Sequence, residues 1–210
     1  MNITEKILAR ASGKSTVSPD DIVFAKVDKV MVHDVSGPGV LKVFDKLQKQ
    51  GIDTSKLHDP TKVWIAEDHF VPSAEKISAE NIVKLSNFSK KYNIKKHFKY
   101  GMGQYGICHT LSHEEALVNP GDVYVGGDSH TNTTGALGAF ACGLGHTDVA
   151  YVLLNGEIWF KVPETYYFKL NGKLPPHVMA KDFILKIIGD IGNDGGAYNT
   201  MQFGGTGIDE

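Results

Sequence analysis

The stretch VYVGGDSHTNTT, residues 123–134, combines a short apolar segment, a glycine pair and the polar triplet Asp128-Ser129-His130. The apolar segment predicts a strand and the glycines predict a turn, after which the chain enters the run GALGAFACGLG. Open α/β sheets place their ligand-binding side chains in the crevice beyond the ends of strands. Asp and Ser are also preferred N-caps, so the triplet could instead only cap the next helix. The stretch alone leaves both interpretations open.

Two other stretches repeat this arrangement of polar residues. The stretch WIAEDHF, residues 64–70, runs from an apolar strand into Asp68-His69, and GQYGICHT, residues 103–110, adds His109. Three imidazoles and two carboxylates are therefore expected at strand ends or in nearby loops. We expect Asp68 and His69 to have different partners, because a carboxylate does not easily reach the ring of the next residue. Without the other stretches, Asp68 would be interpreted as a cap for the following turn.

Strands and helices are predicted to alternate along the chain. Asn2 and Glu5 have the spacing of a capping box at the start of a first helix. Gly-Pro-Gly at 37–39 is predicted to be a turn that precedes the next helix. Further segments with helical or strand patterns follow, with helices at 40–50, 72–92, 148–154 and 180–189 and strands at 62–66, 97–100 and around 123–126. Strands separated by helices of this kind predict an α/β fold with a mainly parallel sheet.

The C-terminal part has two distinctive features. The helix predicted at 180–189 carries apolar residues at helical spacing from Phe183 to Ile188, so we expect that face to point inward. The final stretch, NDGGAYNTMQFGGTGIDE, is rich in glycine, and we expect no closing helix or strand in it.

Composition excludes several classes of protein. The 210 residues carry a net charge of −2, which does not favour a nucleic-acid or membrane surface. No segment approaches the ~20 apolar residues that a membrane-spanning helix needs, and residues 1–14 lack the apolar centre of a signal peptide. Two cysteines do not make a disulfide framework, which favours a reducing, cytoplasmic setting.

Six blocks of sequence, taken in order, resemble the large subunit of the aconitase superfamily. The closest likeness is to its branch of isopropylmalate dehydratases and homoaconitases of the short archaeal type. The blocks are MVHD at 31–34, EDH at 67–69, GICH at 106–109, GDSHT at 127–131, GALGAFACGLGHTDVAYVL at 135–153 and WFKVPET at 159–165. Several blocks in the right order across nearly the whole chain are far more specific than any one of them.

The resemblance implies the architecture. It implies a three-layer α/β/α first domain at 1–174 and the beginning of a second α/β domain at 175–210. Members of this family are much longer than this chain, so we expect it to be the N-terminal portion of a larger protein. A finished domain with a frayed tail is the alternative.

The resemblance also implies a reaction and the residues that perform it. The reaction is the isomerisation of a 2-hydroxy polycarboxylate by loss and return of water, with isopropylmalate as the expected substrate and homoaconitate or citrate as alternatives. The implied catalytic residues, which would control protonation of the leaving hydroxyl, are Asp68, His69, His109, Asp128 and His130.

Pairings within this set are implied as well. His109 would pair with Asp128, while His130 would pair with a glutamate beyond Glu210. Ser129 would contact a substrate carboxylate, and Thr131 and His33 are further residues expected in the substrate pocket.

Family members hold a [4Fe–4S] cluster with three cysteines, two of them in a C-x-x-C pair. This chain has Cys108 and Cys142, which form no such pair and lie in blocks that do not correspond to the cluster ligands. We therefore expect no metal site within this chain and the cluster cysteines beyond Glu210. The resemblance further implies a partner, a small subunit that carries the swivelling domain and the base for the α-proton.

Two other functions stay open at this point. One is a hydrolase that uses the His/Asp set to bind a single metal ion, and the other is a cluster-less domain with a binding or regulatory role. Three local patterns carry less weight. GMGQYG at 101–106 lacks a clear β-α-β unit around it, HTLSH at 109–113 lacks the glutamate of a zinc helix, and the glycines of 135–145 are explained by close packing.

Overall fold

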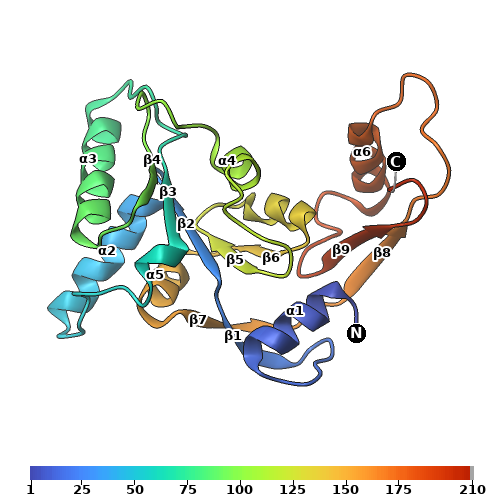
Figure 1. Ribbon diagram of the computed structural model, residues 1–210, viewed down its shortest axis with the longest axis horizontal. Helices are drawn as coiled ribbons and strands as arrows, with labels where there is room; N and C mark the ends of the chain where they lie inside the picture. The colour runs from blue at the N-terminus through green and yellow to red at the C-terminus, as the bar shows by residue number, and fades with distance from the viewer. Residues whose placement is uncertain (209–210) are drawn as a thin grey trace.

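A five-stranded parallel sheet forms the centre of the molecule. The computed structural model describes residues 1–208 and is shown in Figure 1. The strands are, in spatial order, β4 (Lys96–Phe98), β3 (Val63–Ala66), β2 (Lys29–His33), β5 (Val123–Gly126) and β6 (Phe140–Gly143). Every neighbouring pair is parallel. The α/β prediction with a mainly parallel sheet is confirmed.

The order of the strands places a topological switch point between β2 and β5. The chain lays down β2, adds β3 and β4 on one side of it, and then crosses to place β5 and β6 on the other side. The direction in which strands are added therefore reverses between β2 and β5. Open α/β sheets bind ligands at such a switch point, beyond the carboxyl ends of the strands. His33 ends β2 and the Asp128 triplet follows β5, so both lie at this position.

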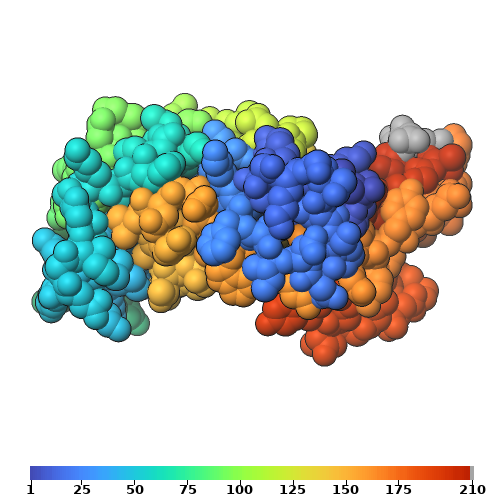
Figure 2. Space-filling model, turned by 90° about the horizontal axis from the view of Figure 1, so that it is seen from below, coloured from blue at the N-terminus to red at the C-terminus, as the bar shows by residue number. Residues whose placement is uncertain are grey.

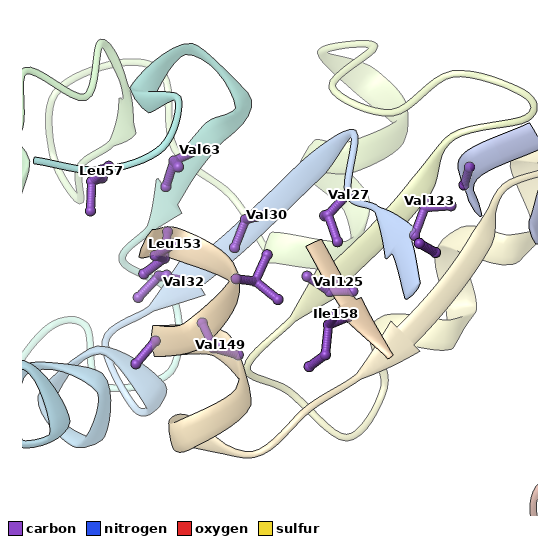
Figure 3. Close-up of a cluster of buried hydrophobic side chains, with 14 of the residues drawn as sticks. Val27, Val30, Val32, Leu57, Val63, Val123, Val125, Val149, Leu153 and Ile158 are labelled. Carbon is purple, nitrogen blue, oxygen red and sulfur yellow. The ribbon is translucent and has the colours of Figure 1, made fainter. Parts of the chain in front are cut away.

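Side chains of the sheet alternate between two cores, as the pleat requires. On β2, Val30 and Val32 join the larger core, while Met31 faces the other side. The larger core, part of which is drawn in Figure 3, is covered by α1 (Ile3–Ser12), α2 (Ser36–Lys49), α3 (Lys76–Lys91) and α5 (His146–Asn155). The smaller core is covered by α4 (Cys108–Glu114). The sheet is thus flanked by helices on both faces.

The smaller core lies beneath the loops at the strand ends. Trp64 on β3 and Tyr124 on β5 are fully enclosed there and stack with ring centroids 6.3 Å apart and an interplanar angle of 9°. Phe98 on β4 meets the Trp64 ring edge-on at 6.2 Å. These rings connect β4 with β3 and, across β2, β3 with β5 on the α4 side of the sheet, and so support the loops above them.

The capping box of the first helix is confirmed. The Asn2 side chain accepts the amide of Glu5 at 2.8 Å, and the Glu5 carboxylate accepts the amide of Asn2 at 3.0 Å. Helix α1 packs on β1 (Ile22–Lys26), which pairs antiparallel with β7 (Glu157–Lys161) in a separate two-stranded sheet.

The turn predicted at Gly-Pro-Gly is wrong, because these three residues belong to the first turn of α2. Proline is tolerated in the first turn of a helix, where its missing N–H would have no partner. The glycines serve close packing. A Cβ at Gly39 would overlap the ring of His146 on α5, and one at Gly37 would overlap Leu85 on α3.

Strand β6 was not predicted. After the polar triplet the chain forms the 3₁₀ helix η2 (Thr131–Leu137), in which the glycine- and alanine-rich run begins, and then enters β6. Strand β6 exists because it pairs with β5 over the whole of its length. A second 3₁₀ turn, η1 (Pro60–Lys62), leads into β3.

The C-terminal residues form a unit of their own, seen at the right of Figures 1 and 2 in orange and red. It consists of β8 (Thr165–Lys169), α6 (Ala180–Ile191) and β9 (Thr200–Gly204), and the two strands pair in parallel. The expectation of no closing strand is therefore wrong. The inward face predicted for α6 is confirmed only in part, since Ile187 is buried and Phe183 is partly buried but Ile184 and Ile188 are exposed. The division at 174/175 stays a prediction.

Within residues 1–208, no helix has the length and apolar character that crossing a membrane demands.

Candidate active site

Four loops meet beyond the carboxyl ends of the parallel strands, and Asp128 lies at their centre. Its Oδ1 accepts the amide of His130 at 2.7 Å and lies 2.8 Å from Nε2 of His109, which is the pairing that the resemblance implies. Its Oδ2 lies 3.5 Å from Nε2 of His33 and 3.7 Å from Nε2 of His69. One carboxylate therefore faces imidazoles from the ends of β2 and β3 and from α4.

The environment of Asp128 favours its ionised form. Partial burial opposes the charge, but the hydrogen bonds from the His130 amide and from the His109 ring outweigh it. The pKa of Asp128 therefore lies below the ordinary range of an aspartate.

His33 is buried, with 1% of its side chain exposed. The backbone determines which of its ring nitrogens carries the proton. Its Nδ1 accepts the amides of Val35 at 3.0 Å and Ser36 at 3.3 Å, so that nitrogen carries no proton. The proton of the neutral ring must then be on Nε2, the atom that faces Asp128. Burial, and next the charge of His69, lower the pKa of His33 and keep it neutral.

Asp68 and His69 bond each other, so the expectation of different partners is wrong. Nδ1 of His69 lies 2.8 Å from Oδ1 of Asp68, while Oδ2 of Asp68 accepts the amide of Cys108 at 2.6 Å. Both residues follow the last residue of β3, where the chain no longer alternates as a strand does. The His69 ring also stacks on His33, with centroids 4.4 Å apart and an angle of 15°. Its Nε2 is thereby directed toward Asp128.

The pKa of Asp68 is also lowered. Burial acts to raise it, but the bonds from the Cys108 amide and from His69 prevail. An ionised Asp68 fixes the position of the proton on His69, since a carboxylate accepts a hydrogen bond from Nδ1–H.

Two carboxylates of this region had no role in the sequence-based predictions. Asp34, directly after β2, is buried and accepts three amides from the loop that follows β3. Glu67, also buried, accepts the amide of Tyr100 at 3.1 Å and lies 2.9 Å from Nε2 of His97. Both residues belong to blocks that carry the family resemblance, and that was the only sequence signal for them.

The triplet and the residue after it differ in exposure. Ser129 is exposed, with its Oγ 3.1 Å from Nδ1 of His130, and 78% of the His130 side chain is open to solvent. Thr131 is fully buried, and its hydroxyl donates to the carbonyl of Asp128 at 2.7 Å. Thr131 therefore supports the turn, and a substrate contact by it stays a prediction. Gly143 on β6 packs against the same carbonyl, which a Cβ would overlap.

Comparison with known proteins decides the family. Residues 5–210 match the model of the "Aconitase family (aconitate hydratase)". The chain belongs to the aconitase family. The "3-isopropylmalate dehydratase large subunit" of Heliobacterium modesticaldum is 47% identical over 210 residues, which are 100% of this chain and 48% of that protein. The protein of the same name from Aquifex aeolicus is 48% identical over 205 residues, 98% of this chain and 46% of that protein. This aconitase-family chain spans about half the length of the curated relatives it matches.

A metal ion held by the His/Asp set is disfavoured by the bonds those side chains already make. One ligand atom from each of His33, Asp34, Asp68 and His69 lies within 4.8 Å of the others. However, Nδ1 of His33 and both oxygens of Asp34 accept backbone amides, and the oxygens of Asp68 are taken by His69 and Cys108. An ion would have to compete with these bonds, so the aconitase-type interpretation of the set is preferred to the mononuclear-metal hydrolase.

The cysteines of this chain do not fit an iron–sulfur cluster. Cys108 is fully buried in the smaller core, where burial and then the Asp68 carboxylate raise the pKa of its thiol far above the ordinary value. Burial also raises the pKa of Cys142. Cluster iron binds thiolates, and both environments oppose the thiolate. Both cysteines behave as small packing residues within this part of the aconitase fold.

The neutral state of buried His33 predicts a loss of stability in mild acid. A histidine whose folded pKa lies below its unfolded pKa costs stability as the pH falls below about 6.5, by up to about 1.4 kcal/mol per pH unit. The cost grows until the pH reaches the folded pKa. Urea unfolding of this chain at pH 7, 6 and 5 should therefore show a steeper loss than in His33→Gln, whose amide can both donate and accept. Equal losses in the two proteins would contradict the neutral assignment.

Proposed function

We propose that these 210 residues are the N-terminal part of the large subunit of a 3-isopropylmalate dehydratase, which interconverts 2-isopropylmalate and 3-isopropylmalate in leucine biosynthesis. The observation that carries the proposal is the group of imidazoles around Asp128 at the switch point of the sheet. The names of the relatives support the choice of substrate.

His69 is proposed as the general acid. Asp68 holds its Nδ1, so in the imidazolium form the second proton is on Nε2, the nitrogen that is not engaged by the carboxylate. Nε2 would donate this proton to the leaving hydroxyl of the substrate as the C–O bond breaks, and water departs. In the return step the neutral ring would take a proton from the incoming water. Proton transfer by a side chain positioned in this way contributes about 10²–10⁴-fold to rate.

The remaining residues are proposed to bind the substrate and to maintain the charge of the Asp128 carboxylate. His109 with Asp128 forms a second dyad, and Nε2 of neutral His33 lies 3.5 Å from the same carboxylate. Ser129 and His130 lie on the exposed side of the triplet, where a substrate carboxylate could reach them. Thr131 and His33 would act from beneath, as supports of the pocket.

The complete protein would contain more than this chain supplies. The base that removes the α-proton is proposed to lie on a separate small subunit, because the relatives are named as large subunits. The [4Fe–4S] cluster is proposed to be bound by cysteines outside these 210 residues. A cytoplasmic setting belongs to the same proposal and is supported by two cysteines that form no disulfide.

The test is an assay of the complete large subunit with its small subunit and a reconstituted cluster. With 2-isopropylmalate, we expect formation of 3-isopropylmalate and the alkene acid between them. Homocitrate and citrate serve as comparison substrates. A preference for homocitrate or citrate would show that the substrate is that of another branch of the family and not 2-isopropylmalate. Turnover of none of the three by a protein with an intact cluster would overturn the proposal.

A further inference from the structure

Asp34 occupies an unusual place in the site. It is the first residue after β2, 1% of its side chain is exposed, and its partners belong to another strand's loop. Its Oδ1 accepts the amides of Asp68 at 3.4 Å and His69 at 3.1 Å, and its Oδ2 accepts the amide of Phe70 at 2.6 Å. Three consecutive peptide groups thus converge on one buried carboxylate.

Such an arrangement holds the backbone firmly. Hydrogen bonds to an ionised acceptor are about twice as strong as bonds between neutral groups. Because the carboxylate is buried, water does not readily replace it as a partner for these amides. His69 and Phe70 themselves are partly open to solvent, with 36% of the His69 side chain exposed. An exposed loop of this kind would otherwise be among the more mobile parts of the chain.

The backbone of this loop determines where the His69 ring lies. From this backbone, Nδ1 of His69 reaches Asp68 at 2.8 Å, its Nε2 lies 3.7 Å from Asp128, and its ring stacks on His33. Asp34 also lies close to both rings, with its Oδ1 4.0 Å from Nδ1 of His33 and 3.9 Å from Nδ1 of His69. A shift of the loop would therefore alter three contacts of one ring together.

We propose that Asp34 is a positioning residue that fixes the direction of the His69 imidazole by holding the backbone of residues 68–70. It touches no reacting atom. Its catalytic consequence rests on the proposed function, whereas its hold on the loop does not. A displacement of a catalytic group by about 1 Å can cost about 10²-fold in rate, so weakening this hold should lower kcat.

The hold on the loop is measured by amide hydrogen exchange in this chain. In the wild type, the amides of His69 and Phe70 should exchange more slowly than that of Ser55, which is bonded to the exposed carboxylate of Asp53. Asp34→Asn retains one acceptor oxygen and places an NH₂ group against an amide N–H, so exchange at 69 and 70 should become at least about tenfold faster. Fast exchange at these amides in the wild type, which needs no variant, would overturn the proposal.

The catalytic consequence is measured in the complete enzyme with its small subunit and cluster. Asp34→Asn should lower kcat by about 10²-fold and change KM by less than about threefold. The matched control is Asp122→Asn, because Asp122 also accepts a backbone amide, that of Asn119 at 2.8 Å, but at the opposite end of β5. If kcat of Asp34→Asn falls only in proportion to the fraction of the protein that is folded, a positioning role is contradicted. An equal loss of kcat in Asp122→Asn would contradict it as well. If the wild type lacks dehydratase activity, the proposed function fails, and the exchange result still decides the role of Asp34.

Discussion

Replacing Asp128 with asparagine should lower kcat of the complete enzyme by about 10³-fold, within the range of general acid–base effects. The wild-type carboxylate is acceptor-only and meets the His130 amide and Nε2 of His109 on one oxygen, with His33 and His69 facing the other. Asparagine has nearly the same shape but no charge, and its NH₂ group would confront an N–H group. The histidines around this position would then no longer share an ionised acceptor.

The expected loss is specific to charge at this position. Asp59→Asn is the control, since Asp59 also accepts a backbone amide, that of Thr61 at 2.9 Å, but lies before β3 at the other end of the sheet. Its kcat should equal that of the wild type. Both variants should be compared by circular dichroism to show that they are folded. If a folded Asp128→Asn protein retains more than about a tenth of wild-type kcat, Asp128 does not have the central role proposed here.

Replacing Trp64 with alanine should reduce the free energy of unfolding of this chain by about 3–5 kcal/mol. Trp64 is 1% exposed and contacts Tyr124 and Phe98 in the smaller core. Alanine would leave a large cavity under the loops that carry the site. Urea denaturation followed by circular dichroism measures the change.

Trp159 provides the comparison for the same chemical change. It lies on β7 with 54% of its surface exposed, so Trp159→Ala should cost less than about 1 kcal/mol. Similar losses in the two variants would show that the smaller core contributes little to stability. A large loss confined to Trp64→Ala would show that this core is a main source of stability for the site.

Much of the fold could be predicted from local patterns. The apolar segments at 63–66 and 123–126 are short and bounded by polar or glycine residues, and both are strands. Strand β6 could not be recognised in the same way, because Phe-Ala-Cys-Gly has no β-branched residue and resembles the glycine- and alanine-rich run around it. Its pairing with β5 makes it a strand, and pairing is a tertiary effect that local propensity does not contain.

The candidate site shows a similar division. The partnership of His109 with Asp128 was anticipated through the family resemblance alone. The bond between Asp68 and His69 was not expected, because adjacent side chains in a strand point to opposite faces, but both residues lie beyond the end of β3. The role of Asp34 could not be predicted, because its partners are backbone amides 34, 35 and 36 positions away. Every residue offers such an amide, so no spacing of residue types reveals the contact.

The parallel pair of β8 and β9 has a practical consequence for work with this chain alone. Two strands leave two open edges, and Tyr166, Tyr167 and Phe203 of these strands are exposed, as are Ile184, Leu185 and Ile188 of α6. Open edges with exposed aromatic groups are templates for aggregation. The isolated chain should therefore self-associate as its concentration rises, and unfolding and exchange measurements belong at the lowest concentration that gives a signal.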